Sequence, residues 1–369
     1  MIKDRFTFGL KTRIYFGENC VTENGELISK LGNRAMIVTG KSSAKRTGAL
    51  DDVLQVFLKH GITGVLFDEV ENNPSLETIQ KAADIARSSE IRFVVGIGGG
   101  SPMDAAKAIA VLADNPDMDP MDMFSNRFES ALPVIAIPTT SGTGSEVTPY
   151  SVILRKDVQT KLSFGNEKTY PLYAFVDPQY TYELNRKYTV STCIDAFTHA
   201  FEGYLANRSN PVTDCFALEA IEIFGKVLPV LKEKDPNREM RKEMSLLSVL
   251  GGIVISQAGV TIPHGMGYCY TYFKGIPHGL ANGLILEEYL KLNEKTVGNK
   301  IQKAMKCMKY QSTQDFLRDF RELTGKPPVL TSEEIALYTK QTLLQKGSIA
   351  NTPYPVDEET IYQLWKNIK

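Results

Sequence analysis

The first half of the chain alternates short apolar runs with amphipathic segments. The runs at residues 35–39, 92–97 and 134–137 are almost continuously apolar, which is typical of strands buried on both faces of a parallel sheet. Residues 51–59 and 75–88 instead have the apolar spacing of helices that cover such a sheet. This alternation predicts a doubly wound parallel sheet. Weaker signals predict paired strands within residues 6–16, strands at 65–67 and 173–177, and helices at 26–31 and 102–113.

The pattern changes after about residue 180, where helical spacing dominates and Pro and Gly mark the joints. The sequence therefore predicts an α/β domain at residues 1–184 and an all-helical domain at residues 185–369. A cleft between two such domains is a usual place for a ligand. The predicted helices of the second domain are 189–206, 211–231, 238–258, 279–293, 313–323, 333–345 and 357–367.

Composition narrows the class of protein. The net charge is -1 with no basic block, so nucleic acid and anionic membranes are poor partners. No apolar run approaches the ~20 residues of a membrane span, and the start of the chain lacks the apolar core of a signal peptide. The five cysteines are scattered without a C-x-x-C pair. We therefore expect a cytoplasmic protein, and a homodimer.

A glycine-rich loop joins the predicted strand at 92–97 to the next helix. It reads Gly98-Gly99-Gly100-Ser101-Pro102-Met103-Asp104. Three glycines let the backbone approach a ligand, and the free N–H groups at a helix start favour an anion such as a pyrophosphate. Ser101, Pro102 and Asp104 fit an N-cap, a first helical position and a capping box. A well-capped tight turn would explain those three residues without a ligand.

A second polar loop follows the next strand. It reads P-T-T-S-G-T-G-S-E at residues 138–146 and includes Thr139, Thr140 and Thr143. Both loops leave the carboxyl ends of predicted parallel strands, where open α/β sheets bind ligands. A surface turn is the alternative, but the density of hydroxyl groups favours contact with a diphosphate or a nicotinamide carboxamide.

A predicted helix in the second half carries Asp195 and His199 four residues apart, on one face. Such a pair can hold a divalent cation, although a hydrogen-bonded pair in a helical core is the commoner meaning. The chain has only four histidines, and His264 and His278 each lie in a P-H-G context that suggests a loop-to-helix edge. One Asp and three imidazoles form a plausible ligand set for Zn or Fe(II). His60, before Gly61, is better explained as a cation at a helix C-terminus.

These motifs together resemble the iron-containing (group III) alcohol dehydrogenases. The matching segments are G-G-G-S-P-M-D at 98–104, P-T-T-S-G-T-G-S-E at 138–146, D-A-F-T-H-A-F-E-G-Y at 195–204, P-H-G-M-G at 263–267 and I-P-H-G-L-A-N-G at 276–283. The resemblance implies an N-terminal dinucleotide-binding α/β domain and a C-terminal helical domain. It also implies that Asp195, His199, His264 and His278 ligate the metal and act in catalysis. Many members carry a further His where this chain has Tyr268, and T-G-M-D where it has T-C-I-D at 192–195.

The resemblance implies reversible hydride transfer between a primary alcohol or diol, or the aldehyde in reverse, and a nicotinamide. A polyol dehydrogenase or an NAD-using lyase of the same fold is the alternative. Such a lyase should have clustered Lys and Arg near the metal, whereas residues 264–283 hold only Lys274. A protein that has lost activity and serves as a scaffold is disfavoured because every ligand position is intact.

The predicted cofactor is NADP, with NAD as the alternative, and the predicted metal is Fe(II), with Zn as the alternative. An acid at the end of an early strand would hold the adenosine ribose 2′-OH. Here the strand at 35–39 is followed by Gly40-Lys41-Ser42-Ser43, which offers a cation and hydroxyls to a 2′-phosphate. The predicted cofactor-binding residues are Gly40, Lys41, Ser42, Ser43, Asn73, Pro74, Gly98, Gly99, Gly100, Ser101, Asp104, Thr139, Thr140, Thr143, Thr148 and Lys161.

Overall fold

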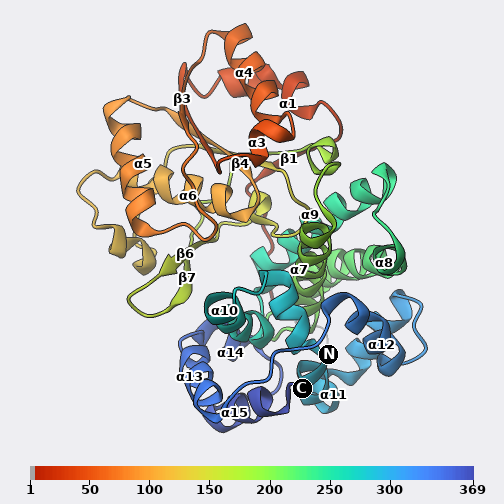
Figure 1. The fold of residues 1–369 in the computed structure, drawn as a ribbon. Helices are drawn as coiled ribbons and strands as arrows, with labels where there is room; N and C mark the ends of the chain where they lie inside the picture. The colour runs from red at the N-terminus through yellow and green to blue at the C-terminus, as the bar shows by residue number, and fades with distance from the viewer. Residues whose placement is uncertain (1–4) are drawn as a thin grey trace. The chain divides into compact units, whose positions relative to one another are not determined.

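The computed structural model describes residues 5–369 in two compact units (Figure 1). One unit is Leu10–Leu184, and the other is Asn185–Lys369 together with residues 5–9. The sequence instead predicts that residues 5–9 belong to the α/β domain. In the structure Phe8 stacks on Phe216, and the Gly9 backbone exchanges hydrogen bonds with the Gln257 side chain. The prediction that the start of the chain lacks the apolar core of a signal peptide concerns residues 1–5, of which the structure describes only Arg5.

The first unit is built on a parallel sheet of six strands in the order β1-β8-β5-β4-β2-β3. The two faces of the sheet hold alternating apolar side chains. Met36 and Val38 face the cluster that contains α5 (Leu76–Ser88) and α6 (Gly100–Asp114). Ala35 and Ile37 face the cluster that contains α1 (Cys20–Glu23) and α4 (Ala49–His60). This confirms the predicted doubly wound sheet. The strands are β1 (Arg13–Phe16), β2 (Arg34–Thr39), β3 (Thr63–Phe67), β4 (Phe93–Gly98), β5 (Val134–Pro138) and β8 (Tyr173–Val176).

The predicted helices of this unit lie close to their expected positions, with α4 and α6 each starting two residues early, and α1 and α3 (Ser43–Arg46) were not predicted. α6 begins at Gly100 and not at residue 102, so Gly99 is its N-cap and Ser101 lies inside its first turn. The helices are α1 (Cys20–Glu23), α2 (Gly25–Ser29), α3 (Ser43–Arg46), α4 (Ala49–His60), α5 (Leu76–Ser88) and α6 (Gly100–Asp114), with short 3-10 helices η1 (Pro120–Ser125), η2 (Ser145–Val147) and η3 (Pro178–Thr181).

Two strand predictions differ from the structure. Residues 6–16 were expected to form paired strands, but only β1 pairs, and its partner is the distant β8. The antiparallel hairpin of β6 (Ser151–Arg155) and β7 (Thr160–Phe164) was not predicted. Its strands carry Arg155 and Lys161, and these charges obscure the apolar alternation that marks a strand.

The second unit is helical, and α7 (Arg186–Leu205) lies within its apolar core (Figure 1). Side chains on nearly every face of α7 are buried, which requires neighbouring helices around it. The other helices are α8 (Pro211–Glu233), α9 (Arg238–Ala258), α10 (Ile262–Lys274), α11 (His278–Cys307), α12 (Thr313–Thr324), α13 (Ser332–Leu343), α14 (Lys346–Asn351) and α15 (Glu358–Asn367).

Two of these helices, α10 and α14, were not predicted, and α11 extends well beyond the expected residue 293. Its backbone departs from helical geometry at Val297, where two helical segments join. Among residues 5–369, no single helix is long and apolar enough to cross a membrane. The pair α9 and α10 meets those criteria only jointly, with a 114° bend between the two helices.

Candidate metal and cofactor sites

Three helices bring the predicted metal ligands together within the helical unit. Asp195 and His199 lie one turn apart on α7, His264 lies in the first turn of α10, and His278 is the first residue of α11. The expected loop-to-helix positions of the two P-H-G histidines are therefore confirmed. The glycine after His278 lets α11 approach α7 closely, because a Cβ atom there would lie 1.9 Å from the Ser191 carbonyl oxygen.

The carboxylate of Asp195 is the common neighbour of the three imidazoles. Its Oδ1 atom lies 4.0 Å from His199 Nε2, 3.6 Å from His264 Nε2 and 3.9 Å from His278 Nε2. The ligand atoms of Asp195, His199 and His264 all lie within 4.8 Å of one another, and His278 approaches this group through Asp195. Four tetrahedral ligand atoms at about 2.1 Å from a metal ion lie about 3.4 Å apart. Small side-chain movements would therefore close this set around one ion.

Burial and charge make this cluster suited to a cation. The side chains of Asp195, His199 and His264 are at most 6% exposed. Burial opposes ionisation of Asp195, but the imidazoles, His199 foremost, hold its pKa well below the ordinary value. Burial likewise opposes charging of His264, yet Glu202 and Asp195 together raise its pKa to about 9. Without a metal ion the cluster thus attracts protons, and a divalent cation would satisfy the same negative potential.

Glu202, Asn282 and Tyr268 also contact the ligands, although the sequence did not predict them as site residues. Glu202 Oε1 lies 2.6 Å from His264 Nδ1, and the side-chain amide of Asn282 donates to Asp195 Oδ1 at 3.1 Å. The ring of Tyr268 stacks on His278 with 5.3 Å between centroids. Helical spacing was the available signal for Glu202, which lies three residues after His199 and seven after Asp195.

The donor set fits a divalent metal ion. It combines one ionised carboxylate with neutral-imidazole nitrogens, a set that both Zn and Fe(II) accept. The Nε2 atom of His264 is buried, and it has no hydrogen-bond partner among residues 5–369. An unpaired buried nitrogen is costly unless a ligand occupies it.

In the α/β unit, the two predicted cofactor loops lie side by side at the carboxyl ends of β4 and β5. Gly98 pairs in register with Pro138, and the Thr139 N–H donates to the Gly98 carbonyl at 2.8 Å. Gly98 has a φ of +152°, and a Cβ atom on it would lie 2.6 Å from the Pro102 ring, so only glycine fits there. The loop at Gly40 leaves the carboxyl end of β2, the neighbouring strand of β4.

Hydrogen bonds link several predicted cofactor residues that are distant in sequence. The Ser101 hydroxyl accepts from the Asn73 N–H at 3.1 Å, and Lys161 Nζ donates to Asn73 Oδ1 at 3.0 Å. The side-chain oxygens of Thr139 and Thr140 are buried and have no hydrogen-bond partner among the described residues 5–369. Backbone groups, hydroxyls and one cation thus gather around the start of α6, where an anion would be stabilised.

The remaining predicted cofactor residues fall into two groups. In the first group, Lys41 and Ser42 are exposed and Ser43 begins α3. Pro74, which follows Asn73, and Thr148, which follows η2, are both buried. Asp104, by contrast, faces protein: its carboxylate accepts from the Ser145 hydroxyl at 2.5 Å and the Val152 N–H at 3.0 Å. The expected capping roles of Ser101 and Asp104 are wrong, because the helix starts earlier and no side chain among residues 5–369 caps it.

Comparison with known sequences decides the family. The pattern of "Iron-containing alcohol dehydrogenase" matches residues 11–178, and that of "Fe-containing alcohol dehydrogenase family, C-terminal" matches residues 189–368. The chain belongs to the iron-containing alcohol dehydrogenase family. It is accordingly an NAD(P)-dependent alcohol dehydrogenase, and the resemblance inferred from its motifs is confirmed.

Individual relatives agree with this assignment. The chain is 36% identical over 293 residues to an NADPH-dependent butanol dehydrogenase of Clostridium saccharobutylicum, covering 78% of this chain and 74% of that protein. It is 29% identical over 305 residues to a lactaldehyde reductase of Escherichia coli K12, covering 81% and 78%. A solved iron-containing alcohol dehydrogenase of Thermotoga maritima superposes with a TM-score of 0.92 at 38% identity, covering 99% of each chain.

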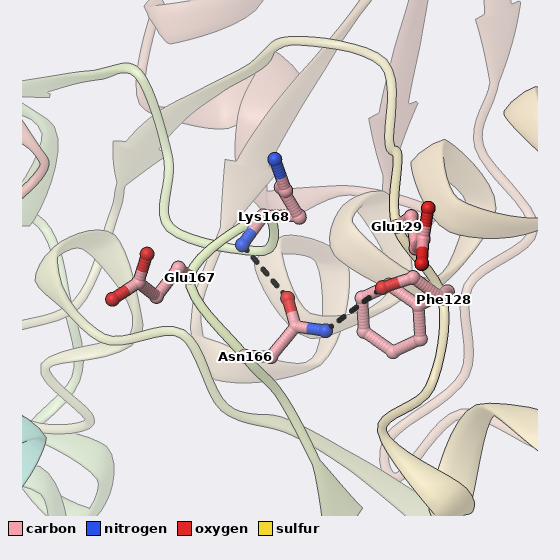
Figure 2. Close-up of a pocket in the computed structure, with 5 residues that line it drawn as sticks. All are labelled: Phe128, Glu129, Asn166, Glu167 and Lys168. Atoms are coloured by element: carbon pink, nitrogen blue, oxygen red, sulfur yellow. Dashed lines mark hydrogen bonds between the residues drawn. The ribbon is translucent and has the colours of Figure 1, made fainter.

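The alcohol dehydrogenase also has a surface hollow, whose lining residues are not among those predicted for either site. Figure 2 shows its lining residues, Phe128, Glu129, Asn166, Glu167 and Lys168. Asn166 organises it, because its side-chain amide donates to the Phe128 carbonyl at 3.1 Å and its Oδ1 accepts from the Lys168 N–H at 2.8 Å.

Proposed function

We propose that this enzyme interconverts a primary alcohol or diol with its aldehyde, using NADP(H) and an Fe(II) ion held by Asp195, His199, His264 and His278. The observation that carries the metal assignment is the position of Asp195 Oδ1, which lies between 3.6 and 4.0 Å from all three imidazole Nε2 atoms. A divalent ion in this set supplies Lewis-acid chemistry to the oxygen of the substrate.

The residues of the chain perform the supporting tasks. Asp195 offsets part of the cation's charge, and the imidazoles present nitrogen lone pairs from three helices. Asn282 donates to Asp195 Oδ1 and so orients the carboxylate. The most exposed edge of the cluster is at His278, whose side chain is 26% exposed while that of His264 is 3% exposed. We propose that the alcohol oxygen approaches the site from the His278 side.

Metal analysis of the purified enzyme, combined with a nicotinamide absorbance assay on primary alcohols, diols and aldehydes, tests this function. We expect one divalent ion per chain and activity that chelation removes and Fe(II) restores. Turnover that is unaffected by complete metal removal would refute the proposal. The lyase alternative gains no support, because Lys274 already forms an ion pair with Glu334.

The preference for NADP is supported by the loop after β2. Lys41 and Ser42 are exposed there, and no Asp or Glu occurs between Thr39 and Lys45. Lys41 and Ser42 would meet a 2′-phosphate with a cation and a hydroxyl, and no carboxylate in this loop would compete for the ribose. Measuring kcat/KM with both cofactors tests the preference, and equal values or a preference for NAD would refute it.

We also propose that the enzyme is a cytoplasmic homodimer. The five cysteines are free thiols, which supports a reducing compartment. Light scattering of the purified enzyme would measure the mass, for which we expect twice the 41.0 kDa of one chain.

A further inference from the structure

The fully buried carboxylate of Glu202 connects two helices at the metal cluster. Its Oε1 lies 2.6 Å from His264 Nδ1, and its Oε2 accepts from the Thr261 N–H at 2.9 Å and the Thr261 hydroxyl at 2.8 Å. Glu202 lies on α7 with Asp195 and His199, whereas Thr261 and His264 lie at the start of α10. One side chain therefore joins the start of one ligand-bearing helix to another.

These contacts determine which nitrogen of His264 can bind a metal ion. Oε2 already accepts from two donors, so the carboxylate is held as an acceptor and Oε1 accepts from an Nδ1–H group. The lone pair of the neutral ring then lies on Nε2. That nitrogen is 3.6 Å from Asp195 Oδ1 and has no hydrogen-bond partner among residues 5–369. Carboxylate contacts of this kind fix the orientation of a ligating imidazole and make it a stronger ligand.

The charge of the cluster leads to the same conclusion. If Asp195 were the only carboxylate near a divalent cation, the buried site would keep a net charge of about +1. A buried net charge is unfavourable in free energy. Glu202 adds the second negative charge through His264, and the sum with the cation is then zero. The side chain of Glu202 is fully buried, and no Lys or Arg among residues 5–369 forms an ion pair with it.

We infer that Glu202 is a positioning residue of the metal site: it holds the proton of His264 on Nδ1, directs Nε2 at the ion and balances the ion's charge. This inference rests on the proposed metal-dependent function and deepens it. Glu202 does not itself contact the ion or the substrate.

The variant Glu202→Gln separates this role from simple helix tethering. A glutamine amide has one acceptor and one donor end, whereas Glu202 accepts from both Thr261 and His264. If the amide oxygen faces Thr261, its NH₂ group faces His264 and favours the ring form with the proton on Nε2, which cannot ligate. We expect metal affinity of the metal-stripped full chain to fall 10- to 100-fold, measured by Zn(II) titration against a chelator.

Two comparison variants sharpen this test. Glu202→Asp keeps the charge on a shorter side chain, and it should recover part of the affinity that Glu202→Gln loses. Thr261→Val removes one donor to Oε2 but leaves both the carboxylate and the Nδ1 contact, and should change metal affinity less than about threefold. If Thr261→Val weakened the metal as much as Glu202→Gln, Glu202 would act only by tethering α10.

A measurement on the wild-type enzyme decides the point even if a variant fails to fold. With only four histidines, ¹⁵N-labelled imidazoles give few signals. In the Zn(II)-loaded enzyme we expect His264 to carry a hydrogen-bonded proton on Nδ1 and to ligate through Nε2. An unprotonated Nδ1, or a folded Glu202→Gln protein that binds metal as tightly as wild type, would overturn the inference. A wild-type enzyme that binds no divalent metal would refute the proposed function instead.

Discussion

Each unit of the enzyme buries a carboxylate among polar groups, and the surroundings of the two carboxylates are opposite. Asp104 in the α/β unit is matched within the chain: Lys107 Nζ lies 3.5 Å from Oδ1, and the Ser145 hydroxyl and the Val152 N–H also reach it. Asp195 in the helical unit is surrounded by imidazole nitrogens at 3.6 to 4.0 Å, too far for direct hydrogen bonds.

The difference separates a structural ion pair from a ligand site. Lys107 is fully buried and also donates to the Ser145 hydroxyl and the Tyr150 carbonyl, both at 2.7 Å, so Asp104 already has its cation. Burial lowers the pKa of Lys107 and raises that of Asp104, although each partner opposes the other's shift. In the described part of the chain no Lys or Arg forms an ion pair with Asp195, and the geometry of its cluster suits an external cation. The assignment of Asp104 to the cofactor stays a prediction, and its contacts favour a supporting role.

The largest expected effect comes from removing one of the imidazoles that we propose bind the metal ion. His264→Ala should abolish metal retention and turnover while the α/β unit keeps its fold, because it removes the most enclosed of the three imidazoles. Metal content and the absorbance assay measure this. His60→Ala, at the end of α4, is the matched control and should retain metal. Near wild-type turnover of metal-free His264→Ala enzyme would contradict the ligand assignment.

Breaking the buried ion pair of Asp104 and Lys107 should lower the stability of the fold and leave metal binding unchanged. Lys107→Met leaves Asp104 buried without its cation and should lower the free energy of unfolding by about 3–5 kcal/mol. Denaturant unfolding measures the loss. Lys226→Met provides the control, since Lys226 forms an exposed pair with Glu222 on α8 and its loss should cost less than about 0.5 kcal/mol. Equal effects in the two variants would show that burial does not distinguish these pairs.

A substitution in the glycine loop tests the anion site beside this ion pair. A Cβ atom on Gly99 would make ordinary contacts of 3.4 and 3.5 Å with Thr140, so Gly99→Val should fold. Its methyl groups would occupy the approach to the N–H groups of α6 and weaken cofactor binding on the order of 100-fold. Nicotinamide fluorescence titration measures this, with the melting temperature as the check on folding. An unchanged titration would remove the loop from the cofactor site.

The smallest expected effect concerns cofactor choice. Lys41→Asp replaces a cation that we expect at the 2′-phosphate with an acid that suits the ribose of NAD. A charge-assisted phosphate contact is worth roughly 1.5–3 kcal/mol, so the kcat/KM ratio of NADP to NAD should fall about 10- to 100-fold. Lys326→Asp, on an exposed segment after α12, makes the same charge change and should leave the ratio unaltered. If the ratio were unchanged in Lys41→Asp, Lys41 would be a solvated surface residue that does not contact the 2′-phosphate.

The sequence by itself determined the sheet strands and most helices, and it predicted the metal ligands. Short, continuous apolar runs such as 35–39 and 134–137 are typical of strands buried on both faces of a parallel sheet. Scarce histidines in P-H-G contexts, with Asp195 and His199 one helical turn apart, predict the ligand set from the sequence alone. These signals are local, and they follow from the spacing of residues along the chain.

Only the tertiary structure decided which partner each buried polar group meets. Helical spacing places Glu202 on the face of Asp195, but it does not reveal that the carboxylate reaches His264 and Thr261. The sequence likewise made Ser101 a cap and Asp104 part of a capping box, whereas Ser101 bonds to Asn73 and Asp104 pairs with Lys107. Desolvation forces a buried polar group to find a partner, and packing of distant segments selects which group that partner is.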